Sequence, residues 1–519
     1  MTAGISGAVN AFSFSLETNT LEIGGALTLA NLAPNGVINT TLASPTVFGN
    51  IRPVGATNLG PTLGVNVNVP STAYIPVGTE FDIVKTQTGT PQSGTNNSVV
   101  AVTVQNPTNP LYTFSAAPTV AGKVTIRTTG IPLQAPLQPP PGAVQPPGQP
   151  IAAAIVPVLV AINPSPDLIT VLASVNALTD AGSVVNAVAQ LGSSSPDLVA
   201  PLVTFQGTRQ FQNLWMSRLE EFHSGQVVDS DGSTMTCGTD ELRSGWWAKG
   251  FGDIGDQDAV AGFEGYDSRV FGTMVGFDKS CGHDTRIGVA AGYARSEIDG
   301  KTFDTDTNIE TYHATGYFGR EFGQGFLYGD LSYGTSDYAA SRHIVFPGVD
   351  RRAISNYDGE SYTAFVAAGR HYSSSGLTIT PMASLQYSRI DLDRHAETGA
   401  GDINLDVAQE DYDFLESGLG VRVADSFGFR GSRYTPDVHM KWLHLIENPT
   451  LSDTASFLVA GSPSFTTPGF KANDDTFNFG FGIASLTTEC NSLEVTYDYN
   501  WRTDQYSSHQ GLVKYTSRF

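Results

Sequence analysis

Apolar and polar side chains alternate strictly along LEVTYDYNW, residues 493 to 501. The residues of one parity are apolar: Leu493, Val495, Tyr497, Tyr499 and Trp501. Successive side chains of a strand point to opposite faces, so one face of this strand meets an apolar environment and the other meets water. Tyr and Trp at the ends of an apolar face are also typical of strands that cross a membrane.

The same period-2 pattern runs from residue 244 to the end of the chain and predicts twelve strands. We expect them at about 244–253, 267–279, 285–298, 308–322, 326–338, 361–372, 377–390, 414–425, 434–447, 476–486, 492–501 and 510–519. Many reach ten residues, whereas strands of soluble proteins average five or six. A tilted strand needs about 9 to 11 residues to cross a bilayer.

The expected connections alternate between long and short. The long ones are 254–266, 299–307, 339–360, 391–413, 448–475 and 502–509, and the short ones are 280–284, 323–325, 373–376, 426–433 and 487–491. Long loops at one end and tight turns at the other are typical of outer-membrane barrels. With an even number of strands, both ends of the barrel lie on the short-turn side.

Composition excludes several classes of protein. The net charge of -22 argues against nucleic acid as a partner. The longest apolar run, IAAAIVPVLVAI at 151–162, is too short for a membrane helix and contains Pro157. The chain has no G-x-S-x-G, H-E-x-x-H or P-loop motif and no C-x-x-C pair. We therefore expect neither an enzyme, nor a metal site, nor a cofactor.

The first part of the chain is organised differently. Residues 1–131 are rich in Thr, Val, Asn, Gly and Pro and predict short strands, in a solenoid end or a small sandwich. PLQAPLQPPPGAVQPPGQP, at 132–150, favours an extended polyproline spacer. SPDL occurs twice afterwards, so Ser165 and Ser195 are candidate N-caps of two helices. In the second helix FQNLWMSRLEEF is apolar on one face.

With these segments in hand, residues 165–519 resemble the autotransporters of type V secretion in Gram-negative bacteria. NALTDAGSVVNAVAQLGSSSPDL and TRQFQNLWMSRLEEF look like the segment that precedes the translocator of that family, and GWWAKGFGD looks like its first barrel strand. The terminal VKYTSRF is similar to the sorting signal read by the barrel assembly machinery, with Val513, Tyr515 and Phe519 as its apolar positions. Motifs in residues 1–131, such as YIPVGTEFDIVKT, resemble the last rungs of a β-helical passenger.

The resemblance implies an all-β fold in which a twelve-stranded antiparallel transmembrane β-barrel holds a pore helix and follows a β-helix-like passenger remnant. We assign 1–131 to the passenger end, 132–164 to a Pro-rich linker, 165–235 to a helical segment with the pore helix, and 242–519 to the barrel. The implied location is the outer membrane, with the N-terminal region at the cell surface. The implied partners are outer-membrane lipid, the barrel assembly machinery and periplasmic chaperones, and the barrel is expected to be a monomer.

Two further expectations concern the ends of the chain and its cysteines. MTAGISGAVNAFSF lacks the basic and apolar regions of a secretory signal, which suggests a fragment of a longer precursor or a misassigned start. Cys237, Cys281 and Cys490 are all expected on the oxidising periplasmic side, where one disulfide or three free thiols fit the sequence equally.

The pore helix carries the candidate functional residues, Arg209, Asn213 and Arg218. It should run from outside to inside, because the first barrel strand starts on the short-turn side. We expect Arg209 and Arg218 to pair with lumen-facing acids such as Glu494 and Asp498, although hydrated acids fit the pattern too.

Some members of the family cut their own chain in the pore at an Asn-Asn step, but this helix offers Gln212-Asn213, so self-cleavage is not expected. The competing hypothesis is a structural or porin-like channel with a periplasmic N-terminal region. A pore helix favours secretion over that channel.

Overall fold

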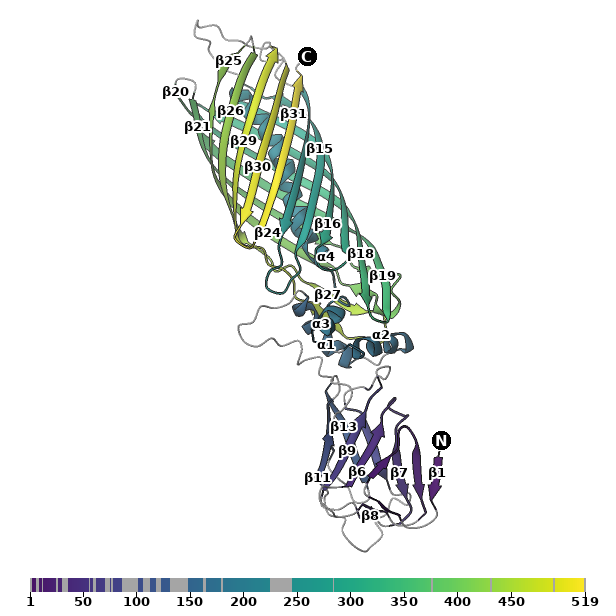
Figure 1. Cartoon of the computed structure of the whole chain (residues 1–519). Helices are drawn as coiled ribbons and strands as arrows, with labels where there is room; N and C mark the ends of the chain where they lie inside the picture. The colour runs from purple at the N-terminus through teal and green to yellow at the C-terminus, as the bar shows by residue number, and fades with distance from the viewer. Residues whose placement is uncertain are drawn as a thin grey trace.

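The computed structural model describes most of the helices and strands of the chain. The described residues are 2–5, 9–11, 13–24, 27–29, 36–55, 57–58, 62–70, 75, 78–85, 101–105, 113–117, 123–130, 148–161, 165–178, 181–224, 245–282, 284–374, 377–429, 432–488 and 491–517. A long barrel lies at one end, a β-rich unit with the N-terminus lies at the other, and helices lie between them (Figure 1).

The barrel wall consists of twelve antiparallel strands. They are β14 (Gly245–Gln257), β15 (Tyr266–Ser280), β16 (Thr285–Gly300), β17 (Thr305–Phe322), β18 (Gly325–Phe346), β19 (Val349–Arg370), β21 (Leu377–Leu392), β24 (Glu410–Asp425), β26 (Ser432–Glu447), β29 (Asp475–Thr488), β30 (Asn491–Arg502) and β31 (Tyr506–Ser517). Pairing of β14 with β31 and of β19 with β21 closes the barrel. The twelve predicted strands are confirmed.

The extracellular connections were predicted less well than the strands. Residues 339–360, expected as a loop, belong to β18 and β19, which are 22 residues each and meet in a two-residue turn at Pro347 and Gly348. Gly348 has φ 88°, a conformation that favours glycine. The connections expected at 299–307 and 502–509 shorten to 301–304 and 503–505. Strand pairing therefore continues beyond the bilayer. Every second side chain of β18 and β19 is still buried or half-buried there against the protein.

The wall alternates as predicted between an apolar outer face and a polar inner face. On β30, Leu493 and Val495 are exposed, whereas Asp498 and Asn500 are buried. A row of exposed tyrosines crosses neighbouring strands: Tyr293, Tyr312, Tyr333, Tyr362 and Tyr387. Aromatic rows of this kind mark the interface of a bilayer. The row therefore places the extracellular membrane surface near the middle of β18 and β19.

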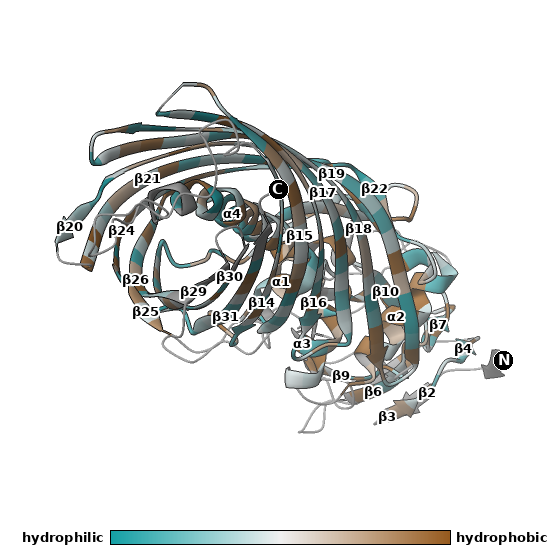
Figure 2. Ribbon diagram, turned by 90° about the horizontal axis from the view of Figure 1, so that it is seen from above, coloured by the Kyte–Doolittle hydropathy of each residue, from teal (hydrophilic) through white to brown (hydrophobic). Residues whose placement is uncertain are grey.

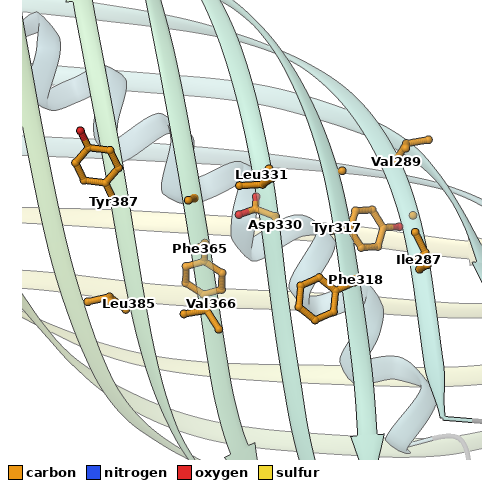
Figure 3. Close-up of a pocket in the computed structure, with 13 residues that line it drawn as sticks. Ile287, Val289, Tyr317, Phe318, Asp330, Leu331, Phe365, Val366, Leu385 and Tyr387 are labelled. Carbon is orange, nitrogen blue, oxygen red and sulfur yellow. The ribbon is translucent and has the colours of Figure 1, made fainter.

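The outer face below the tyrosine row is not smooth. A groove of about 780 Å³ crosses β16 to β21, and its floor contains Gly316 and Ala364. Figure 3 shows its lining side chains, with Ile287, Phe318 and Leu331 among those labelled. The lining is almost wholly apolar, as expected for a surface in contact with hydrocarbon.

Four short strands and three helices lie at the extracellular end. The strands are β22 (His395–Ala396), β23 (Leu405–Val407), β27 (Asp453–Phe457) and β28 (Ser464–Thr467), next to the 3-10 helix η3 (Gly401–Ile403). The helices are α1 (Gln149–Ala161), α2 (Pro166–Asn176) and α3 (Ala181–Ala189). We call this group the cap. Helix α1 lies within residues that the sequence assigned to the linker.

The predicted N-cap residue is correct for one of two helices and wrong for the other. Ser165 caps α2 as predicted, and its Oγ accepts from the backbone N of Leu168 at 3.1 Å. Helix α4 (Ser195–Ser224) is capped instead by Ser194, whose Oγ accepts from the backbone N of Asp197 at 3.3 Å. The prediction of Ser195 as a cap was one residue too late, because either serine can supply the oxygen.

The N-terminal unit is a parallel solenoid. Its strands are β1 (Thr2–Ile5), β2 (Val9–Ala11), β3 (Ser13–Ser15), β4 (Thr20–Ile23), β5 (Leu27–Leu29), β6 (Gly36–Thr41), β7 (Asn50–Pro53), β8 (Thr57–Asn58), β9 (Thr62–Asn68), β10 (Glu80–Lys85), β11 (Ala101–Gln105), β12 (Thr113–Ala116) and β13 (Lys123–Gly130). Three parallel stacks, β1-β4-β7-β10, β2-β5-β8 and β3-β6-β9-β11, build successive rungs. Strands β13 and β12 end the first of these stacks with antiparallel pairing. The solenoid alternative is confirmed over the sandwich.

The short strands β20 (Tyr372–Ser374) and β25 (Phe427–Phe429) extend two hairpins at the opposite, short-turn end of the barrel. Within the described chain, no helix is both long and apolar enough to cross a membrane.

Candidate functional site

Helix α4 lies inside the barrel, as the view along the barrel shows (Figure 2). It starts beside the cap and points toward the short-turn end (Figure 1). It packs mainly on β14 to β18, and also contacts β21. Irregular or helical chain at membrane depth is stable only where protein or a water-filled lumen surrounds it, and the lumen meets that condition.

A buried ion cluster joins the C-terminal half of α4 to the wall. Arg218 Nε donates to Asp278 Oδ2 on β15 at 2.9 Å, and Arg286 on β16 pairs with the same carboxylate. Asp278 also accepts from the hydroxyl of Tyr317 at 3.3 Å. The Arg218 and Asp278 side chains are 3% and 0% exposed. This pair is therefore shielded from solvent, and removing one partner leaves a buried charge.

Three other contacts attach the same face of α4. Trp215 Nε1 donates to Asp330 Oδ2 on β18 at 3.2 Å, and Lys249 Nζ on β14 donates to the carbonyl of Leu214 at 2.8 Å. Phe211 stacks on His313 of β17 with ring centroids 4.5 Å apart. Since these contacts come from different strands, they define both the rotation and the depth of the helix.

Arg209 pairs with a different strand of the barrel wall. Its Nη1 donates to Glu416 Oε2 on β24 at 3.0 Å. The arginines of the pore helix therefore do pair with lumen acids, but the predicted partners were wrong: Arg209 binds Glu416 and Arg218 binds Asp278. Strand parity places an acid in the lumen, but does not give its height relative to the helix.

The predicted acids are lumen-facing, and each has a partner from the wall. Glu494 pairs with Lys514 of the neighbouring strand. Asp498 Oδ1 lies 2.8 Å from Nε2 of His439, and it accepts from Nδ2 of Asn478 at 2.9 Å. These acids stabilise the inner face of β26 to β31 through partners on the wall itself.

The side of α4 that faces β21 to β31 borders two overlapping cavities. Asn213 and Met216 line both, Glu220 lines one and Arg209 the other. The cavity volumes are about 80 Å³ and 50 Å³. A polar cavity of more than about 10–15 Å³ can hold water. The helix is thus dry on one side and borders water on the other.

The remaining predicted positions lie at the short-turn end. Val513 is exposed on the outer face of β31, and Tyr515 lies in the same strand. Cys281 carries a free, exposed thiol in the turn between β15 and β16. Phe519, Cys237 and Cys490 lie outside the described residues. Among the described side chains, no group of three or more His, Cys, Asp or Glu is arranged to hold a metal ion.

The cap is a further site, which the sequence did not reveal. Both guanidinium ends of Arg351 on β19 donate to Asp167 of α2, at 2.8 and 2.6 Å. These hydrogen bonds hold the pKa of Asp167 below its usual value, against partial burial. Arg342 on β18 donates to Glu397 at 3.1 Å and to the carbonyl of Gln190, after α3, at 2.5 Å. The helices are therefore bound to the extended tips of β18 and β19.

Comparison with known proteins identifies the barrel. The family model for the autotransporter β-domain matches residues 246–500. The chain belongs to the autotransporters. Its β-domain is a translocator of the outer membrane, and the expected barrel fold and outer-membrane location are confirmed.

Relatives of this autotransporter are much longer than the chain. It is 25% identical over 351 residues to outer membrane protein B of Rickettsia prowazekii, which covers 63% of the chain and 21% of that relative. It is 26% identical over 323 residues to outer membrane protein A of Rickettsia conorii, covering 59% of the chain and 15% of the relative. The chain therefore spans about a fifth or less of these relatives. Among solved structures, it is similar to the translocator domain of NalP from Neisseria meningitidis, with a TM-score of 0.45, 17% identity, and coverage of 62% of this chain and all of that one.

Proposed function

We propose that the barrel delivers the solenoid and the cap helices to the cell surface and keeps them there through α4. One observation carries the proposal: a single helix joins the cap at the extracellular end to the lumen wall next to Arg218, ahead of the first strand. A chain in this position has its N-terminal side outside the barrel. Periplasmic retention of the solenoid would require the opposite direction of α4.

The ion pairs of α4 support stable attachment. Arg218 and Asp278 are buried, and one carboxylate serves two arginines. A segment in transit needs weak contacts, whereas this one has a pair whose loss costs several kcal/mol. We infer that the barrel with α4 bound in its lumen is the resting state after delivery. We also infer that the chain is not cleaved between Gln212 and Asn213.

The same proposal covers the partners of the barrel and its lack of enzymatic activity. The barrel works as a monomer in outer-membrane lipid, and the assembly machinery inserts it by reading the terminal Val513, Tyr515 and Phe519. Periplasmic chaperones are further partners in this proposal. In this proposal the barrel itself has no catalytic activity, and its task is to deliver or display the N-terminal unit. The porin-like alternative loses support because α4 occupies the lumen.

Surface access of an N-terminal tag tests the proposal. The chain is expressed behind a cleavable signal peptide with one epitope tag at residue 2, and in a second strain the tag lies in the 281–284 turn. Antibody and protease should reach the first tag on intact cells and the second only after the outer membrane is broken. Access to the first tag only in broken cells would leave a channel with a periplasmic domain.

A further inference from the structure

The lumen of this barrel is filled very differently at its two ends. From Arg209 to Glu220, about 16 Å along the helix at 1.5 Å per residue, α4 borders the two polar cavities. The cavities take in charged side chains of the wall, including Arg422, Asp437 and Lys441. The side of α4 that faces these cavities does not form a tight seal, because polar walls favour water.

The preceding turns of α4 are enclosed by apolar side chains instead. Val199, Leu202, Val203 and Phe205 are all buried. The surrounding inward-facing residues come from nine wall strands: Tyr266 and Val270, Ile298, Ile309, Tyr338, Tyr357, Ile390, Tyr412 and Phe414, Leu445, and Tyr506. We call this ring, together with the four helix residues, the collar.

Specific contacts close the collar around the helix. Phe205 stacks on Phe414 with ring centroids 4.6 Å apart, and Thr204 shares a 2.9 Å hydrogen bond with the Tyr338 hydroxyl. Tyr338 stacks on Tyr357 at 4.8 Å, and Tyr357 stacks on the ring of His395 at 4.0 Å. The same aromatic column thus runs from the collar into the cap.

We propose that the collar is the permeability barrier of the resting translocator, and that the remainder of the lumen stays hydrated. A closely packed ring of aromatic and aliphatic side chains excludes ions and hydrophilic solutes, because neither can replace its hydration there. The helix below the collar anchors the chain but does not seal the pore. This deepens the proposed function, since it locates the seal that must form after delivery.

Permeability of matched variants tests the collar. Phe414→Ala on the wall and Phe205→Ala on the helix each remove one ring of the stacked pair, and Phe414→Leu keeps an apolar side chain of similar reach. Met382→Ala is the control, because Met382 lines both cavities and lies outside the collar. Conductance in planar bilayers should rise several-fold in both alanine variants and stay unchanged in Phe414→Leu and Met382→Ala.

Labelling in cells gives a second reading in the full chain. Thr496→Cys lines a cavity, and it is placed in a chain whose three native cysteines are changed to serine. A membrane-impermeant maleimide added outside intact cells should not label it until Phe414→Ala or Phe205→Ala is added. Each strain is scored only among cells that display the residue 2 tag, so a failed delivery is separated from a failed seal.

Three outcomes overturn the inference. The first is wild-type conductance in both alanine variants while their tags are displayed. The second is labelling of Thr496→Cys from outside with the collar intact, and the third is a leak in Met382→Ala as large as in Phe414→Ala.

Discussion

Replacing Asp278 by asparagine should loosen the pore helix more than any change at Arg209. The side chain of Asp278 is 0% exposed and pairs with Arg218 and Arg286, which are 3% and 9% exposed. Asparagine has nearly the same shape, so packing is kept and the charge alone is removed. Two buried guanidinium groups would then face each other without a carboxylate.

The structure gives the magnitude of this effect. Breaking one buried pair by removing a partner costs about 3–5 kcal/mol. Because one carboxylate serves two arginines, we expect Asp278→Asn at the upper end of that range. Arg218→Met leaves Asp278 its pair with Arg286, and should cost less. Arg209→Met leaves Glu416 beside a hydrated cavity, and should cost only about 1–3 kcal/mol.

Urea unfolding in lipid vesicles measures these free energies, with the summed fluorescence of the five tryptophans, Trp215 of α4 among them, as the probe. Asp284→Asn is the matched control, because it makes the same chemical change at an exposed residue of the adjacent turn. Equal unfolding midpoints for Asp278→Asn and Asp284→Asn would refute the conclusion that the ion cluster fixes α4. So would a larger loss in Arg209→Met than in Asp278→Asn.

Three other predictions concern the cap and the chain end. Burial, and then the charge of Asp197, raise the pKa of Asp453 to about 7. Since this exceeds the unfolded value of about 3.9, cap stability should fall as pH rises from about 4 through about 7. Amide exchange of the cap at pH 5 and pH 8 should show this loss, and Asp453→Asn should abolish it. Ser165→Ala should destabilise α2 by about 1 kcal/mol, seen as faster amide exchange in α2 but not in α4. Removal of Phe519 should lower the amount of folded, heat-modifiable barrel in the outer membrane, and an undiminished amount would contradict its role as a sorting residue.

Strand positions could be predicted from the sequence because successive side chains of a barrel strand face lipid and lumen in turn, so hydropathy alternates along the whole strand. Leu493 and Asp498 differ in parity, and parity alone gives their faces. The same rule fails beyond the membrane. The hydropathy of residues 339–360 alternates less clearly, because one face contacts the cap and the other contacts water. Their many polar residues therefore led to the prediction of a loop.

The partners of the pore helix could not be predicted, for a geometric reason. Asp278 has the parity of Met274, so its lumen-facing position was readable in the sequence. Its height against Arg218 depends on the tilt of β15 and the depth of α4, and neither is local in sequence. The cap was missed for a related reason: Arg351 and Asp167 are 184 residues apart, and neither carries a local signal of pairing.

The closed collar also constrains the order in which the molecule is made. Phe205 stacks on Phe414 inside the closed wall, so a helix with bulky side chains would have to break such contacts to slide along the barrel axis. Most of the wall contacts of α4 come from β14 to β18, the strands that directly follow it in the chain, and contacts between near neighbours in sequence form early. This arrangement predicts that the first five strands assemble around the helix before β14 pairs with β31.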